Sequence, residues 1–324
     1  MKNITYIDLF SGLGGFRIAL DSLDFQCVYS ADNDKHAVEI YKENFGDDSY
    51  NDITKISPED IPDFDILCGG FPCQPYSASG QKKGFEDTRG TLFFDICRII
   101  DKKHPKIVFL ENVKNLEQHD KGNTLKVIKK SLNDLGYHVD YKVLNARDFG
   151  VPQNRERIII IANNLGKTFD FDKINKQTIT SMKRFLDTTG DFEYLHKDEY
   201  TLIDNPKRQP SDLLFVGYRN KNIRKNGVKE NTENLSRAHK QPNRIYSADG
   251  VHPTLSSTES SGRYFILIDG KVRKLTIDEC FRFMGFPKDY KKIGKKTQLY
   301  KRIGNSICVP MVKEIGKQIE KQLL

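Results

Sequence analysis

The sequence lacks the long hydrophobic segments of membrane and secreted proteins. Its longest unbroken aliphatic run lies near Ile158–Ala162, far short of the roughly 20 residues that a membrane-spanning helix needs. The N-terminal residues also lack the apolar stretch and the small-residue cleavage site of a signal peptide. We therefore expect a cytoplasmic protein with no membrane partner.

Metal-binding and redox motifs are also missing. The six cysteines form no C-x-x-C pair, which argues against a zinc site or a dithiol redox centre. The histidines are scattered along the chain, so we expect no metal. In a reducing compartment a cysteine is by default a small buried hydrophobic residue. A catalytic role for any of them must be supported by its neighbours.

Positive charge is concentrated in one part of the chain. Residues 207–302 hold 22 lysines and arginines against nine acidic residues, a net charge of +13. The whole chain of 324 residues carries +8, so the remainder carries −5. A solvated surface would explain one run of charge, but an excess this concentrated favours binding to nucleic acid.

Strands alternate with helices in the first half of the sequence, which predicts an α/β fold. Six apolar runs are expected strands: Ile4–Phe10, Phe25–Tyr29, Phe64–Cys68, Lys106–Leu110, Val139–Leu144 and Arg157–Ala162. Helices are expected over Phe16–Leu23, Lys35–Asn44, Leu92–Ile100, Thr124–Leu135 and Ile307–Leu324. This alternation is typical of a buried parallel sheet, which binds ligands at the carboxyl ends of its strands.

A glycine-containing loop, within Asp8–Phe16, follows the first expected strand. Its spacing is not the G-x-G-x-x-G pattern of dinucleotide sites, so a purely structural turn is an equal alternative. Asp32 ends the second strand, where a carboxylate can accept both hydroxyls of a ribose. Asp52 could bind an adenine amino group, with Ile53 against the ring. No Walker lysine follows the loop, so the pattern suits S-adenosylmethionine, whose sulfonium Phe10 could face.

The most specific motif is Gly69–Ser77, which reads GGFPCQPYS after the third expected strand. Cys73 lies between two prolines in this loop, whereas Cys68 lies within the strand and is expected in the core. A thiol of ordinary pKa is only slightly ionised at neutral pH, so a nucleophile needs a base or a positive charge nearby.

Two later motifs supply such partners. Glu111 ends the fourth expected strand, and Arg155 and Arg157 lie at the start of the last one. Taken singly, Glu111 is more simply a surface carboxylate, and the Arg-Glu-Arg triplet a salt-bridged edge. Together, and in this order, these residues predict an active site.

The ordered set resembles the cytosine-C5 DNA methyltransferases of bacterial restriction–modification systems. The matching segments span residues 4 to about 310: Asp8–Arg17, Pro72–Gln74, Glu111–Val113, Gln153–Arg157, Arg273–Thr276, Met284–Pro287 and Gly304–Ser306. The resemblance implies a Rossmann-like, S-adenosylmethionine-dependent methyltransferase domain with a mostly parallel sheet, over residues 1–188 and 303–324. A smaller, irregular, β-rich target-recognition domain and hinge would occupy residues 189–302, with a DNA-sized cleft between the domains.

The resemblance also implies the site residues. Catalytic roles fall on Cys73, Glu111, Arg155 and Arg157. S-adenosylmethionine, with S-adenosylhomocysteine as product, would be bound by Phe10, Gly12, Gly14, Asp32, Asn33, Asp52, Ile53, Pro72, Leu92 and Asn305. DNA contacts fall on Ser79, Gln81, Arg89, Gln241, Arg244 and Thr254. The chain departs from the family at Asp32, where glutamate is usual, and at Asn33, where a bulky residue commonly packs on the adenine.

The implied reaction begins when the Cys73 thiolate attacks C6 of cytosine, which makes C5 nucleophilic enough to take a methyl group. A protonated Glu111 would bind N3 and accept from the N4 amino group, which needs a pKa raised toward neutrality by burial. Arg157 would hold O2, and Arg155 would supply positive potential or a phosphate contact. Loss of the C5 proton and of the thiol then restores aromaticity.

The target cytosine must leave the duplex before C6 is accessible. Ser79 and Gln241 would fill the vacated space, and Thr254 would guide the phosphate of the flipped nucleotide. The segment Gln81–Asp95 resembles the mobile loop that closes over DNA in this family. Arg244 is the candidate for reading guanine, with a phosphate contact as an equal alternative.

We expect a monomer that acts on double-stranded DNA at the bacterial nucleoid, beside a cognate restriction endonuclease. An RNA cytosine-C5 methyltransferase would share the Pro72–Gln74 and Glu111–Val113 motifs, but the large basic insert favours duplex DNA. A non-catalytic DNA-binding relative would have lost Cys73 or Glu111. A nicotinamide oxidoreductase needs the missing dinucleotide pattern, and an amino-methylating enzyme needs an Asn/Asp-Pro-Pro-aromatic box, which is absent.

Overall fold

The computed structural model describes residues 3–72, 92–220, 232 and 234–324. The chain divides into two compact units, and each is discontinuous in sequence. The first unit comprises residues 1–144, 156–175 and 306–324, and the second comprises residues 145–155 and 176–305. The assignment of target recognition to residues 189–302 stays a prediction.

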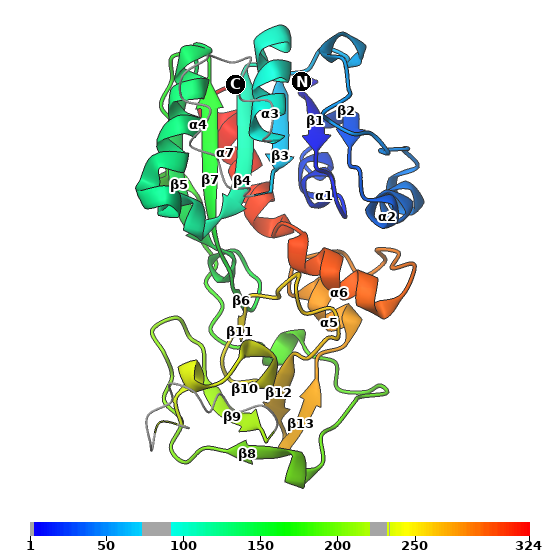
Figure 1. Cartoon of the computed structure of the whole chain (residues 1–324), viewed down its shortest axis with the longest axis vertical. Coiled ribbons are helices and arrows are strands. Elements are labelled where there is room, and N and C mark those ends of the chain that lie inside the picture. Colours follow the sequence, from blue (N-terminus) through cyan, green and yellow to red (C-terminus); the bar gives the residue numbers. More distant parts are fainter. Residues whose placement is uncertain (1–2, 73–91, 221–231, 233) are drawn as a thin grey trace. The chain divides into compact units, whose positions relative to one another are not determined.

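The first unit is built on a six-stranded mixed sheet with the order β2-β1-β3-β4-β7-β5 (Figure 1). Its strands are β1 (Thr5–Leu9), β2 (Gln26–Ala31), β3 (Ile66–Gly70), β4 (Ile107–Val113), β5 (His138–Asn145) and β7 (Glu156–Asn163). Each lies where the sequence predicts a strand, and the α/β class is confirmed.

The sheet is parallel from β2 through β4, but β7 runs antiparallel to β4. No α-helix connects β5 to β7, whereas a parallel pair needs a long crossover connection. The change of direction matters for the site, because it brings the first residues of β7 to the edge where β4 ends.

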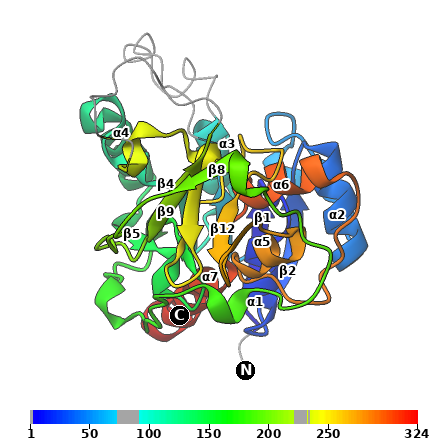
Figure 2. The ribbon, with the colours of Figure 1, turned by 90° about the horizontal axis from the view of Figure 1, so that it is seen from below.

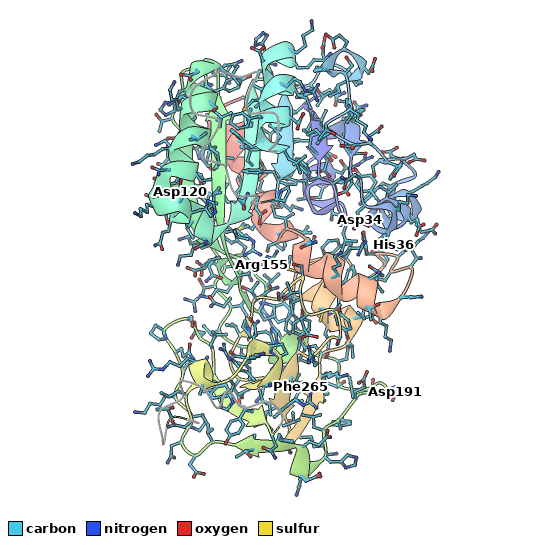
Figure 3. All side chains as sticks on the ribbon, in the orientation of Figure 1. Asp34, His36, Asp120, Arg155, Asp191 and Phe265 are labelled. Carbon is cyan, nitrogen blue, oxygen red and sulfur yellow. The ribbon has the colours of Figure 1, made fainter. Side chains whose placement is uncertain are left out.

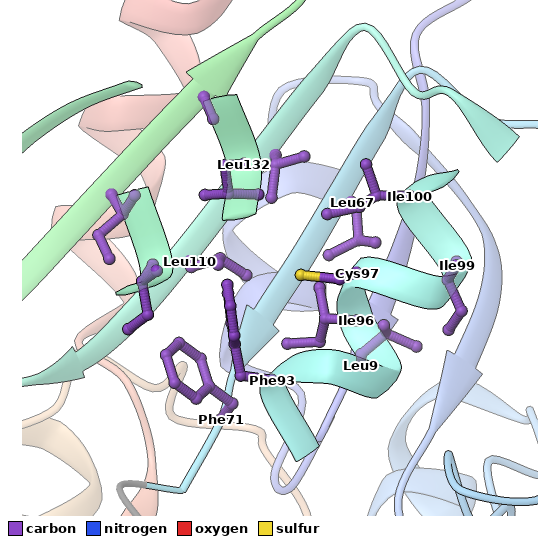
Figure 4. Packing of buried hydrophobic residues seen from close by; sticks show 14 of the residues in the cluster. Leu9, Leu67, Phe71, Phe93, Ile96, Cys97, Ile99, Ile100, Leu110 and Leu132 are labelled. Carbon is purple, nitrogen blue, oxygen red and sulfur yellow. The ribbon is translucent and has the colours of Figure 1, made fainter. Parts of the chain in front are cut away.

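Helices cover both faces of this sheet. The helices are α1 (Gly15–Asp21), α2 (Lys35–Phe45), α3 (Leu92–Lys103), α4 (Asn123–Asp134) and α7 (Val309–Gln322). Alternate residues of a strand point to opposite faces, and β4 follows this rule. Val108 and Leu110 join the core formed with α3 and α4, whereas Phe109 meets Phe16 of α1, with 5.0 Å between the ring centroids. Figure 4 shows the α3 side of this core, where Leu9, Leu67 and Leu110 surround Phe93 and Ile96.

The C-terminal helix belongs to the first unit, which includes residues 306–324. Helix α7 packs on α1. A Cβ atom on Gly316 would lie 2.8 Å from Leu20 Cδ2, so a larger residue would force the leucine side chains of this contact to shift.

The second unit contains a five-stranded sheet with the order β13-β12-β10-β9-β8, seen from below in Figure 2. Its strands are β8 (Tyr200–Leu202), β9 (Phe215–Arg219), β10 (Arg244–Ser247), β12 (Phe265–Ile268) and β13 (Lys271–Lys274). A short pair joins β6 (Gln153–Asn154) to β11 (His252–Pro253), and the α-helices are α5 (Ile277–Arg282) and α6 (Lys296–Asn305). The strands are short and the connections long, as predicted for an irregular, β-rich part of the chain.

Short 3-10 helices connect several of these elements. They lie at Pro58–Asp60, Lys114–Glu117, His119–Gly122, Ala146–Asp148, Phe171–Lys173, Lys183–Phe185, Lys197–Glu199, Ser236–Ala238 and Gln241–Asn243. No helix in the described part of the chain has both the length and the apolar character needed to cross a bilayer.

Candidate active site

The loop after β1 has a backbone that few side chains adopt. The φ angle is +57° at Phe10, +53° at Gly12 and +73° at Gly14, a region that favours glycine. A Cβ on Gly14 would lie 2.3 Å from Phe45 Cε2, and one on Gly15 would lie 2.6 Å from Ile307 Cγ2. The glycines therefore let the loop pass close to α2 and to the segment before α7. Phe10 has the left-handed conformation without being glycine, and such strain concentrates at functional sites.

Asp32, at the end of β2, is oriented by this loop. One carboxylate oxygen accepts from the Gly12 N–H at 2.8 Å, and the other accepts from the Asp34 N–H at 2.8 Å. Each carboxylate oxygen has two lone pairs, so a carboxylate oriented in this way can still accept from a hydroxyl. The geometry fits the ribose-binding role that the sequence predicts.

Several other predicted cofactor residues contact the core that includes α3. Asp52 accepts hydrogen bonds from the hydroxyl and the backbone N–H of Thr54 at 2.8 and 3.1 Å, and these bonds lower the pKa of the Asp52 carboxyl. Ile53 is buried in the α3 core cluster, and Phe10 and Leu92 pack against that cluster. Three apolar side chains from distant segments thus contact the same core cluster. Pro72 and Asn33 are exposed.

Glu111 and Arg157 meet at the edge of the sheet. In the antiparallel register of β4 and β7, Glu111 pairs with Ile159 and Val113 with Arg157. The Arg157 Nε lies 3.0 Å from Glu111 Oε1, and the two side chains are only 11% and 12% exposed. The structure therefore brings together two of the four predicted catalytic residues as a largely buried ion pair.

Asn112, to which the sequence analysis gave no role, anchors the chain that leads to the predicted nucleophile. Its buried side-chain amide donates to the Phe71 carbonyl at 2.8 Å, two residues before Cys73. The motif that presents Glu111 thus also fixes the end of β3. Cys73 itself lies outside the described residues, as do Ser79, Gln81 and Arg89.

Arg155 lies in the second unit, where β6 ends (Figure 3). Its side chain is buried and donates to the carbonyl oxygens of Leu255 and Gly304 at 3.2 and 3.0 Å. These two partners are backbone carbonyls, whereas a partner of Arg157 is a carboxylate. A catalytic role for Arg155 stays a prediction.

The predicted DNA-contacting residues of the second unit are also held by carbonyl oxygens. Gln241 Nε2 donates to the Thr254 carbonyl at 2.8 Å, so these two residues are neighbours. Arg244 Nε donates to the His239 carbonyl at 2.9 Å. Asn305 is exposed and directly precedes Ser306, whose Oγ would lie 3.4 Å from a Cβ on Gly15 in the loop after β1.

Asp8 is a further polar residue of this region, inside β1 and just before the loop that contains Gly12 and Gly14. It is fully buried, and burial raises the pKa of its carboxyl to about 8. The sequence hints at this residue only weakly, as a single carboxylate in an otherwise apolar strand. Its neutral form is the one that the fold accommodates.

Comparison with known proteins shows to which family this chain is similar. The family model of C-5 cytosine-specific DNA methylases matches residues 4–321. The chain is 44% identical to the type II methyltransferase M.HhaI of Haemophilus parahaemolyticus, over 100% of this chain and 96% of that protein. It is 40% identical to the type II methyltransferase M1.ScrFI of Lactococcus lactis subsp. cremoris, over 97% of this chain and 77% of that protein.

Among solved structures, the S. pombe Dnmt2 methyltransferase has the same fold, with a TM-score of 0.72 at 19% identity over 98% of this chain and 99% of that one. The match to the family model covers nearly the whole chain. This chain therefore belongs to the C-5 cytosine-specific DNA methylase family, and it is a DNA cytosine-5 methyltransferase of the kind that uses S-adenosylmethionine.

Proposed function

We propose that this chain methylates a cytosine that is flipped out of a short, specific site in double-stranded DNA, acting as a monomer in the cytoplasm at the nucleoid. We propose further that it protects host DNA from a cognate restriction endonuclease, because M.HhaI and M1.ScrFI are both type II methyltransferases. The observation that carries the proposed site is the 3.0 Å contact between Arg157 and Glu111. Glu111 pairs with Gly70 at the end of β3, and Cys73 follows β3 three residues later in the sequence.

Cys73 is the proposed nucleophile. Its thiolate forms a bond to C6 of cytosine, and the electron pair of the C5–C6 double bond shifts so that C5 becomes the nucleophilic carbon. After C5 has gained a methyl group, a base removes the C5 proton. The C6–S bond then breaks, which returns the thiolate and restores the aromatic ring.

Glu111 and Arg157 would bind the edge of the base that carries N3, N4 and O2. Arg157 would donate to O2, and protonated Glu111 would donate to N3 while its other oxygen accepts from the N4 amino group. The 3.0 Å contact between the two side chains supports a shared role at one edge of the base.

S-adenosylmethionine supplies a methyl group bonded to a sulfonium sulfur. A carbon nucleophile can take this methyl group without a metal, and the neutral thioether leaves. Asp32 would accept from the ribose hydroxyls and Asp52 from the adenine amino group. The apolar side chains of Phe10, Ile53 and Leu92, which contact the same core cluster, would pack against the remainder of the adenosine. Gly12, Gly14, Asn33, Pro72 and Asn305 would complete the binding site.

Base flipping and recognition are assigned to the second unit together with Ser79, Gln81 and Arg89. Gln241 and Thr254 are neighbours, which supports a joint role in filling the vacated stack and guiding the flipped phosphate. Arg244 could pair bidentately with guanine, a contact that contributes about 1–3 kcal/mol of discrimination.

Conversion sequencing of DNA from cells that express the chain tests the proposed function. We expect 5-methylcytosine at every copy of one short site and at no other cytosine. Product analysis of hydrolysed DNA is the necessary companion measurement. Recovery of N4-methylcytosine, or of methylation in RNA but not in duplex DNA, would contradict the proposal.

A further inference from the structure

We propose that Arg155 is a positioning residue that joins the chain segments leading to Arg157 and Asn305. The inference rests on the proposed function of those two residues. The chain passes between the two units at residues 144/145, 155/156, 175/176 and 305/306. Arg155 lies at the second of these crossings. It is hydrogen-bonded to Asn145 and Ala146 at the first crossing and to Gly304 at the last.

The backbone of Arg155 is bonded to the first crossing. Its N–H donates to Asn145 Oδ1 at 3.0 Å, and its carbonyl accepts from the Ala146 N–H at 2.9 Å. Asn145 Nδ2 also donates to Asn154 Oδ1 at 2.5 Å. Residues 145–146 and 154–155 are thus hydrogen-bonded to one another where the chain enters and leaves the second unit.

The side chain of Arg155 reaches the last crossing. One terminal nitrogen donates to the Gly304 carbonyl at 3.0 Å, and the other donates to the Leu255 carbonyl at 3.2 Å. Gly304 directly precedes Asn305, and Leu255 directly follows Thr254. One guanidinium therefore holds the residues next to a proposed cofactor contact and next to a proposed DNA contact.

Burial and chemistry favour positioning over direct contact with DNA. Arg155 is only 1% exposed, and both terminal nitrogens are used by backbone carbonyls. A phosphate-binding arginine needs its planar fork at the surface. A lysine at this position would keep the charge, but it could not reproduce a rigid fork that spans two carbonyls.

Substitution of Arg155 by lysine and by alanine separates the two roles. For a positioning residue, we expect both variants to lose kcat by roughly 10- to 100-fold, because small displacements of reacting groups have effects of this size. KM for S-adenosylmethionine should also rise, while the salt dependence of DNA binding stays as in the unaltered chain. If Arg155→Lys keeps at least half of the activity, the rigid fork is not needed and the proposal is wrong. If Arg155→Ala lowers the salt slope by about one, Arg155 contacts phosphate and the proposal is also wrong.

A second pair of variants leaves the guanidinium in place. Asn145→Ala removes the acceptor for the Arg155 N–H, whereas Asn145→Asp keeps it and allows the Asn154 amide to turn and donate. We expect a loss of kcat in Asn145→Ala that Asn145→Asp largely restores, at matched thermal stability. Equal activity in the two variants would overturn the proposal even if Arg155→Ala fails to fold. Absence of 5-methylcytosine with the unaltered chain would instead refute the proposed function.

Discussion

The predicted site residues of the two units have different kinds of partners. In the first unit, charged groups are matched, as Arg157 is to Glu111, and Asp32 is oriented by backbone N–H groups. In the second unit, Gln241 and Arg244 donate to backbone carbonyls. The neutral bond of Gln241 contributes about 0.5–1.5 kcal/mol, and the bond from the charged Arg244 about 1.5–3 kcal/mol. The comparison teaches that the groups predicted to do chemistry are already matched by charge or by backbone N–H groups, whereas those predicted to contact DNA are held by carbonyl oxygens that bonds to DNA would have to replace.

The largest effect is expected from breaking the matched pair of the first unit. Glu111→Gln keeps the shape of the side chain but cannot deliver a proton, so we expect the single-turnover rate of methyl transfer to fall by about 10²- to 10⁴-fold. DNA affinity, measured in parallel by filter binding, should change far less. A rate within threefold of the unaltered chain would show that Glu111 is not the proton donor.

Substitution of Asp32 tests whether a carboxylate oriented by the Gly12 and Asp34 N–H groups contributes to the affinity for S-adenosylmethionine. Asp32→Ala removes the acceptor of the Gly12 and Asp34 N–H groups and of the proposed ribose hydroxyls. We expect KM for S-adenosylmethionine to rise roughly 10- to 100-fold, since hydrogen bonds to a charged group contribute about 1.5–3 kcal/mol each. Asp32→Glu is the matched control and should retain most of the affinity. An unchanged KM in Asp32→Ala would remove this residue from the cofactor site.

In the second unit, Gln241→Gly should have a smaller and conditional effect. Flipping costs a few kcal/mol in a normal duplex and less at a mismatch, so the filling side chain matters most for a paired target. We expect Gln241→Gly to weaken binding to a matched site several-fold more than binding to the same site with a mismatched target. Equal weakening on both duplexes would argue that Gln241 contributes only its contact with Thr254.

The smallest effect on methylation is expected at Asp8, whose influence is on stability. The pKa of Asp8 is raised to about 8, so the folded chain keeps a proton that the unfolded chain releases above its ordinary pKa of 3.8. The contribution of Asp8 to stability is therefore present at acid pH and is lost as the pH rises toward 8.

Asp8→Asn removes this dependence. Relative to the unaltered chain, the variant should gain at least about 1 kcal/mol, or a few degrees in Tm, between pH 5 and pH 8. Thermal unfolding of both chains at the two pH values measures this difference. A difference in Tm that does not vary with pH would show that Asp8 is ionised in the folded state.

The sequence predicts the framework of the first unit well, because strands and helices there have clear hydrophobic patterns. It also predicts that Glu111 lies at the carboxyl end of a strand, where sites form. That Arg157 lies beside Glu111 follows from the antiparallel direction of β7, which the sequence reveals only through the missing helix before it.

The partners of Arg155 were beyond sequence analysis. In a regular strand Arg155 and Arg157 would point to the same face, but the strand is interrupted at Arg155, between β6 and β7. Its carbonyl partners are 100 and 149 residues away in the chain. Contacts this distant follow from tertiary packing, which no local pattern encodes.

Covalent trapping tests the central claim, that a cysteine of this chain attacks a cytosine. A duplex with 5-fluorocytosine at the methylated position cannot lose a proton from C5, so the bond between Cys73 and C6 should persist once the methyl group has been transferred. We predict a complex that survives denaturing electrophoresis, that requires S-adenosylmethionine, and that Cys73→Ala does not form. If the unaltered chain methylates ordinary duplexes yet never becomes linked to this one, the account of its chemistry is contradicted.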